Sequence, residues 1–89
     1  MAQSVCYLCR ADAQSSKEFD PESRSLVTTV DCPRCGHYRL TPHAWTKHER
    51  ACLAAYVQHE NQVRRGPPLI GAANWGTLVR LGEALLERR

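Results

Sequence analysis

Four of the five cysteines fall into two short pairs, which are the strongest chemical signal in the chain. Cys6 and Cys9 form the first Cys-x-x-Cys pair, Cys32 and Cys35 form the second, and residues 10–31 separate them. Each pair spans one tight turn, so its two sulfurs can face the same side of the backbone. Two such turns brought face to face supply four thiolates in the tetrahedral arrangement that Zn2+ prefers. We therefore predict one structural zinc ion with these four cysteines as ligands.

Disulfide bonds are the other use of cysteines in a chain of 89 residues. Against them, the number of cysteines is odd, and the residues before Cys6 are too few and too polar for a secretion signal. We expect metal binding in a reducing, cytoplasmic compartment. No apolar run approaches the roughly 20 residues of a membrane-spanning helix, so we expect a soluble protein.

Four further residues raise the question of additional chemistry. His37 follows the second cysteine pair and is an alternative ligand, although four thiolates already complete the shell. His48 and Cys52 lie four residues apart on one helical face, and His43 is off that face. A second metal site and a Cys52 nucleophile with a histidine base are the reactive interpretations. We favour a buried, inert Cys52 with histidines at the surface.

The chain contains no recognisable catalytic motif. It has no serine elbow, no glycine-rich phosphate loop and no pair of carboxylates at a catalytic spacing. A four-thiolate site leaves no open position for water or substrate, so its zinc would be structural. We expect a protein that is not an enzyme.

Several residues are candidates for contacting a partner. They are cations near the second cysteine pair and on or just after the first predicted helix, together with one neighbouring tyrosine. They are Arg34, His37, Tyr38, Lys47, Arg50, Arg64 and Arg65. Acidic residues are interleaved with these cations along the helices, so a solvated helix face is an equally simple interpretation. The formal charge is +3, and one zinc ion with four thiolates lowers it to about +1. Nucleic-acid-binding domains are usually more basic.

The two cysteine turns need strands to bring them together. Residues 25–31 are rich in β-branched side chains and run into Cys32, which predicts a strand. Residues 15–19 are its expected hairpin partner, across a turn at 20–23. Residues 37–40 alternate as a short third strand.

The residue after each cysteine pair shapes its turn. Gly36 follows Cys35 and can take the left-handed conformation that aims backbone amides at the sulfurs. Arg10 holds the equivalent place after Cys9, so we expect the first turn to be looser.

Two helices complete the expected fold. Thr41 and Pro42 are a typical N-cap and first helical residue, and Asn74 can cap a second helix that Gly76 and Gly82 weaken. The fold class is α+β, with a small zinc-ribbon-like antiparallel sheet of two or three strands followed by two packed helices. The single domain over 1–89 then comprises a zinc ribbon at 1–40, a first helix at 41–65 and a second helix at 74–88.

Residues 6–40, with Cys-Pro-Arg-Cys-Gly at 32–36, resemble a zinc ribbon with a rubredoxin-type second knuckle. This resemblance covers under half of the chain and implies a metal site and a local fold, not an activity. The run at 32–41, the helix after it and Gly-Pro-Pro-Leu-Ile at 66–70 are similar to an N-terminal zinc-binding module of uncharacterised bacterial proteins. That second resemblance implies no catalytic residues.

Taken together, these features predict a non-enzymatic, zinc-stabilised protein-interaction module. Two tryptophans and several arginines, which are enriched in binding hot spots, favour a protein partner. A small inhibitor or adaptor of prokaryotic or phage origin, for example an anti-CRISPR-like protein, is the specific hypothesis. A zinc ribbon that binds DNA or RNA in transcription regulation is the alternative.

Overall fold

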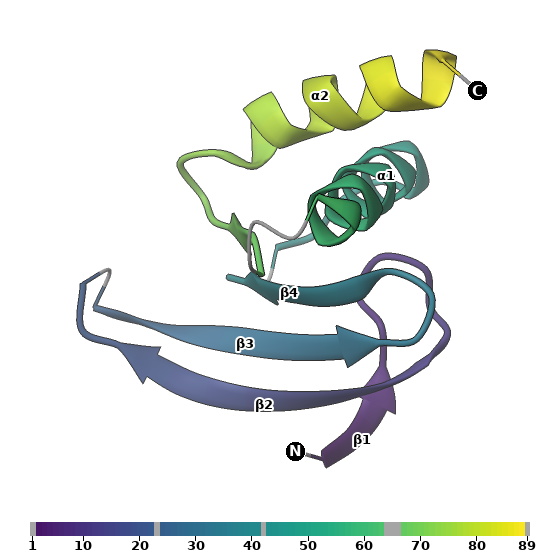
Figure 1. Ribbon diagram of the computed structural model, residues 1–89. Coiled ribbons are helices and arrows are strands. Elements are labelled where there is room, and N and C mark those ends of the chain that lie inside the picture. The colour runs from purple at the N-terminus through teal and green to yellow at the C-terminus, as the bar shows by residue number, and fades with distance from the viewer. Residues whose placement is uncertain (1, 23, 42, 64–66, 89) are drawn as a thin grey trace.

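The computed structural model describes residues 2–22, 24–41, 43–63 and 67–88. A curved sheet lies on one side of the molecule and two helices lie on the other (Figure 1). The strands are β1 (Ala2–Val5), β2 (Asp12–Asp20), β3 (Ser25–Cys32), β4 (Gly36–Leu40) and β5 (Leu69–Ile70). The helices are α1 (Lys47–Gln62) and α2 (Trp75–Glu87). The α+β class is confirmed, whereas the predicted roles of Pro42, Arg64 and Arg65 lie outside the described residues.

The described sheet has five strands in the order β1-β2-β3-β4-β5, not the two or three that we predicted. It is mixed rather than antiparallel, because β5 runs parallel to β4. The carbonyls of Pro68 and Ile70 accept hydrogen bonds from the N–H groups of Arg39 and Thr41, at 2.8 and 2.9 Å. β1 and β5 are too short to show a periodic pattern, so their pairing depends on the tertiary fold.

The hairpin of β2 and β3 extends beyond its neighbouring strands (Figure 1). Among the described residues of the hairpin, only residues 12–15 of β2 pair with β1, and only residues 28–32 of β3 pair with β4. At the turn, Oδ1 of Asp20 accepts the N–H of Glu22 at 3.1 Å. The described part of this hairpin end therefore projects as a two-stranded ribbon.

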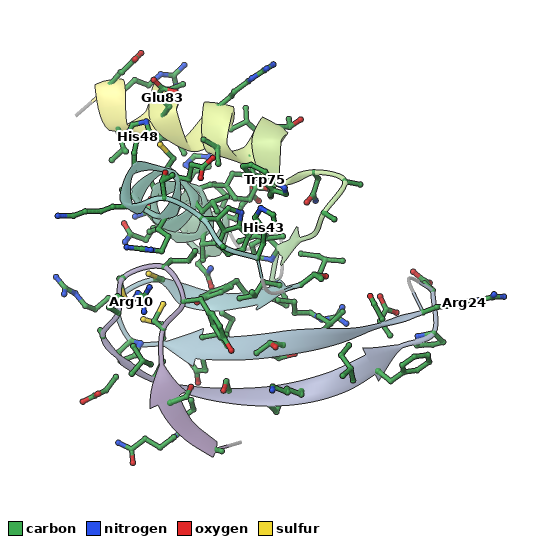
Figure 2. All side chains as sticks on the ribbon, turned by 180° about the vertical axis from the view of Figure 1, so that it is seen from behind. Arg10, Arg24, His43, His48, Trp75 and Glu83 are labelled. Carbon is green, nitrogen blue, oxygen red and sulfur yellow. The ribbon has the colours of Figure 1, made fainter. Side chains whose placement is uncertain are left out.

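Helix α1 begins at Lys47, so the prediction that Thr41 caps it is wrong. The Thr46 hydroxyl accepts the N–H of Glu49 at 3.1 Å, and the Glu49 carboxylate accepts the N–H of Thr46 at 2.8 Å. This reciprocal capping box satisfies two otherwise unpaired donors and fixes the start of the helix. Residues 43–46 are not helical, and the His43 ring packs against Trp75 with centroids 5.1 Å apart (Figure 2).

Helix α1 forms the middle layer, between the sheet and α2 (Figure 1). Small side chains on α1 permit close packing, and Gly82 of α2 lies against the backbone of Cys52. A Cβ at Gly82 would stand 1.8 Å from the carbonyl oxygen of Cys52. Gly82 is therefore required by the helix contact, a role that its poor helix propensity concealed.

The start of α2 is close to the prediction, but Asn74 acts differently. Its side chain makes no capping hydrogen bond to α2. Instead, Oδ1 accepts the N–H of Gly71 at 2.7 Å and Nδ2 donates to the carbonyl of Leu69 at 2.8 Å. Asn74 thus holds the loop that carries β5.

The core lies between the sheet and α1. Tyr38 and Leu40 of β4 point to the same side, as alternate residues of a strand do, and both are fully buried. Leu53 and Val57 of α1 and Ile70 of β5 are equally buried. Within the described residues, neither helix has the length and apolar character needed to cross a membrane.

Candidate metal centre

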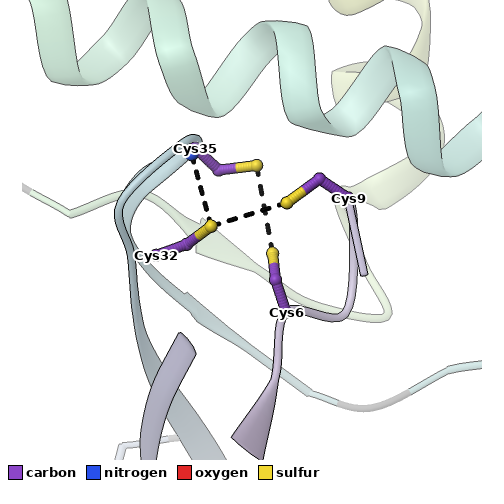
Figure 3. Close-up of side chains that lie close together, drawn as sticks. All are labelled: Cys6, Cys9, Cys32 and Cys35. Atoms are coloured by element: carbon purple, nitrogen blue, oxygen red, sulfur yellow. Dashed lines mark hydrogen bonds between the residues drawn. The ribbon is translucent and has the colours of Figure 1, made fainter. Parts of the chain in front are cut away.

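The four paired cysteines converge at one end of the sheet, as predicted (Figure 3). Cys6 and Cys9 lie on the turn after β1, Cys32 is the last residue of β3, and Cys35 lies on the turn between β3 and β4. The antiparallel pairing of β1, β2, β3 and β4 brings these two turns together. The strands thus supply the scaffold that two distant cysteine pairs require.

Both turns are closed by backbone hydrogen bonds directed at sulfur. The N–H of Leu8 points at Sγ of Cys6 at 3.5 Å, and the N–H of Cys35 points at Sγ of Cys32 at 3.4 Å. Such bonds stabilise the thiolate form that a metal needs.

Arg10 and Gly36 adopt the same left-handed backbone region, with φ of 64° and 100°. For a non-glycine residue this conformation costs on the order of 1 kcal/mol. The hydrogen bond from the N–H of Arg10 to the carbonyl of Cys6, at 3.1 Å, holds the turn and offsets this cost. Both turns therefore place a left-handed residue directly after the second cysteine.

The sulfur positions fit a single tetrahedral metal ion. The Cys6 and Cys35 sulfurs lie 3.9 Å apart, and those of Cys9 and Cys32 lie 3.5 Å apart. All four sulfurs lie within 4.8 Å of one another. Sulfurs bound at about 2.3 Å to a tetrahedral zinc ion are separated by about 3.8 Å. These four residues would hold the metal, and their soft thiolate donors suit Zn2+.

Tyr38 contacts this centre from inside the core, so it is not the exposed partner contact that we predicted. Its side chain is fully buried, because β4 directs it between the sheet and α1. Its hydroxyl oxygen accepts the N–H of Tyr7 at 3.1 Å and lies 3.0 Å from Sγ of Cys6. Burial, and then the contact with Cys6, raise the pKa of Tyr38. When Cys6 is a thiolate, as metal binding requires, the phenol is the donor to its sulfur.

The contact between the Cys6 and Cys35 sulfurs shifts their pKa values in opposite directions. The hydrogen bond with Cys35 lowers the pKa of Cys6 to about 4, against the opposing effect of burial. The same contact raises the pKa of Cys35. Of the four cysteines, Cys9 is half-buried and the other three are fully buried. Even this partial burial raises the pKa of Cys9.

Helix α1 reaches the second turn through the side chain of Asn61. Its Oδ1 accepts the N–H of His37 at 3.0 Å, and its Nδ2 donates to the carbonyls of His37 and Val57 at 3.0 and 2.8 Å. The amide replaces a neighbouring strand on β4 where β5 does not reach. A Cβ on Gly36 would lie 2.5 Å from Cγ of Asn61. Sequence reasoning missed Asn61, because only the folded contact distinguishes it from a surface residue.

The other predicted residues are distributed over the surface. Arg34, His37 and Lys47 are exposed and Arg50 is half-buried. His37 is not a ligand: its Nε2 lies 3.6 Å from the Asp31 carboxylate. Arg64 and Arg65 lie outside the described residues.

The second metal site that the sequence raised as an alternative does not assemble in the described part of the chain. Sγ of Cys52 lies 3.6 Å from Nε2 of His48, but no third metal-binding side chain joins them. His43 packs against Trp45 and Trp75 instead. Burial, and then the charges of two glutamates, raise the pKa of Cys52. These features agree with the interpretation of Cys52 as a buried thiol.

Comparisons with protein families, with curated proteins and with solved structures found no match for the chain. The paired cysteine turns are consistent with a zinc-ribbon-like site. The resemblance to bacterial zinc-binding modules stays a prediction.

Proposed function

We propose that the chain is a non-enzymatic, zinc-stabilised module that binds a protein partner. The four thiolates fill a tetrahedral shell, so the zinc serves the fold rather than a reaction. The binding surface would be supplied by the elements that this site holds together. Because the ligands must stay reduced, this role fits a reducing compartment such as the cytoplasm.

The observation that carries this proposal is an exposed apolar pair on the projecting hairpin. Phe19 and Leu26 face each other across β2 and β3. They are 63% and 61% exposed, although they are large apolar residues. Within the described residues, neither β1 nor β4 extends far enough to cover this pair. Exposed aromatic and aliphatic side chains at a protruding position are typical of protein-binding sites.

A small module with such a surface suits an inhibitor or adaptor, including the anti-CRISPR-like role considered above. It would act by covering or bridging part of its partner. Nucleic-acid binding is the second candidate, and the exposed cations Arg10, Arg34 and Lys47 around the cysteine turns favour it.

Affinity capture with the zinc-loaded protein tests the proposal. In a nuclease-treated extract of the source organism, we expect one protein to be retained at a fixed stoichiometry. The double variant Phe19→Ser/Leu26→Ser should lose most of that retention while keeping its zinc. Nuclease-sensitive capture, or gel shifts at submicromolar protein with a salt slope of several ions, would support the nucleic-acid candidate instead.

A further inference from the structure

A cationic groove lies between the first cysteine turn, α1 and the end of α2. Its volume is about 360 Å³. Arg10 contributes from the cysteine turn, and Lys47 and Arg50 contribute from the start of α1. Among the described residues, none that lines the groove is acidic. Figure 2 shows Arg10 beside the cluster of cysteine sulfurs, at the opposite end of the molecule from Arg24 on the hairpin.

In the described part of the chain, these cations form no ion pair with an acidic side chain. The ion pair found there joins His37 to Asp31, away from the groove. Arg50 donates from Nη1 to the carbonyl of Trp45 at 3.2 Å, which orients its guanidinium group and leaves other N–H donors available. Lys47 is the first residue of α1, where the helix dipole disfavours a cation. Its charge therefore has no stabilising role in the helix.

The negative charge of the thiolates gives a reason for only one of these three cations, Arg10. Cys9 lines the groove, and the charge of Arg10 helps to offset the thiolates there. Lys47 and Arg50 come from a different element and add two more cations to the same wall. An anionic group in the groove would therefore meet a net positive surface.

Apart from the Cys9 sulfur and the Gln58 amide, the rest of the groove is aliphatic. Its aliphatic side chains include Leu8, Ala54, Ala55 and Leu86, and none of the described residues that line the groove is aromatic. Single-stranded nucleic acids are usually bound by aromatic rings on which the bases stack. An aliphatic wall beside cations instead matches a peptide that carries both carboxylates and branched apolar side chains.

We propose that this groove binds an acidic segment of a protein partner. Its carboxylates contact Arg10, Lys47 and Arg50, and its aliphatic side chains pack against the alanines of α1. This inference rests on the proposed function, because it names the kind of protein segment that the module recognises.

Selection from a random 12-residue peptide library displayed on phage tests the inference, with the zinc-loaded protein as target. We expect the selected peptides to be enriched in Asp and Glu next to Leu, Ile or Val. Fluorescence anisotropy with a selected peptide should show at least about tenfold weaker binding to Lys47→Glu/Arg50→Glu. The control Lys17→Glu/Arg80→Glu makes the same change in net charge at exposed positions outside the groove and should bind within about twofold of the parent. Zinc content and far-UV circular dichroism check that each variant is folded, and Lys47→Gln alone replaces the double variant if that one is not.

The outcomes separate this inference from the proposed function. Peptides without acidic enrichment, equal weakening in both double variants, or failure to select any peptide would overturn the groove assignment. A captured partner that still binds Lys47→Glu/Arg50→Glu but not the Phe19/Leu26 variant would leave only the proposed function standing. A 20-nucleotide single strand that binds the groove more tightly than any selected peptide would overturn both.

Discussion

Replacing Gly82 by alanine should destabilise the protein, even though alanine is the better helix former. The added Cβ would lie 1.8 Å from the Cys52 carbonyl oxygen, whereas real Cβ contacts essentially never fall under 3.0 Å. The difference between these distances requires a backbone displacement of at least 1.2 Å between α1 and α2. The helices cannot relieve this overlap by changing a rotamer, because the opposing atoms belong to the backbone.

The magnitude follows from two opposing effects. Overpacking a well-packed contact costs about 1–3 kcal/mol and sometimes more, and a backbone overlap of this size belongs at the upper end. The gain in helix propensity from glycine to alanine returns about 1 kcal/mol. We expect a net loss of about 2 kcal/mol in the free energy of unfolding. For a domain of this size, that lowers the melting temperature by about 8–16 °C.

Gly76 provides a matched control on the same helix, since a Cβ there would meet no atom within 4 Å. Gly76→Ala should therefore stabilise the protein by about 0.5–1 kcal/mol. Urea and thermal unfolding of the zinc-loaded proteins, monitored by circular dichroism, measure both effects. An unchanged urea m-value shows that the variants differ in stability alone. A Gly82→Ala protein as stable as the parent would refute the close contact between the helices.

Four further outcomes test the metal centre and its surroundings. Tyr38→Phe should keep the fold but weaken zinc binding by about tenfold in competition with a chromophoric chelator, and unchanged affinity would argue against its hydrogen bond to Cys6. Cys32→Ser, or chelation of the parent protein, should abolish the strands of the N-terminal half in NMR spectra, whereas a folded, zinc-free variant would contradict the architecture. Asn61→Ala should lower the free energy of unfolding by about 1–3 kcal/mol and speed amide exchange in the second cysteine turn. Unaltered exchange would show that the Asn61 amide does not replace a neighbouring strand on β4. Because the pKa of Cys52 is raised, its thiolate is scarce at pH 8 and grows as pH rises, so iodoacetamide should label it at least about tenfold more slowly than a free cysteine peptide. Rapid labelling in peptide mapping would disprove its burial.

The features that could be predicted are those with a local chemical reason. The spacing of Cys6, Cys9, Cys32 and Cys35 identified the metal-binding cluster, since each turn is specified by a few adjacent residues. The β-branched run at 25–31 likewise identified β3, because alternation and branched side chains are local properties.

The features that could not be predicted depend on contacts between distant residues. Thr41-Pro42 and Thr46 with Glu49 are both valid start signals, and the packing of the His43 ring against the distant Trp75 favours the second. Tyr38 was correctly placed on a strand, but whether it faces a partner or a cysteine sulfur is decided by the position of α1.

Because β2 is largely polar, the metal centre also affects how β2 and β3 align. Ser15, Ser16, Lys17 and Glu18 bury little apolar surface, so burial imposes only a weak penalty on a slipped alignment with β3. A slip would carry Cys32 away from the turn that bears Cys6, and the four thiolates could not then meet. A metal ion that needs all four thiolates can therefore bind only one alignment of the hairpin. Metal binding then stabilises the correctly paired chain relative to misaligned ones.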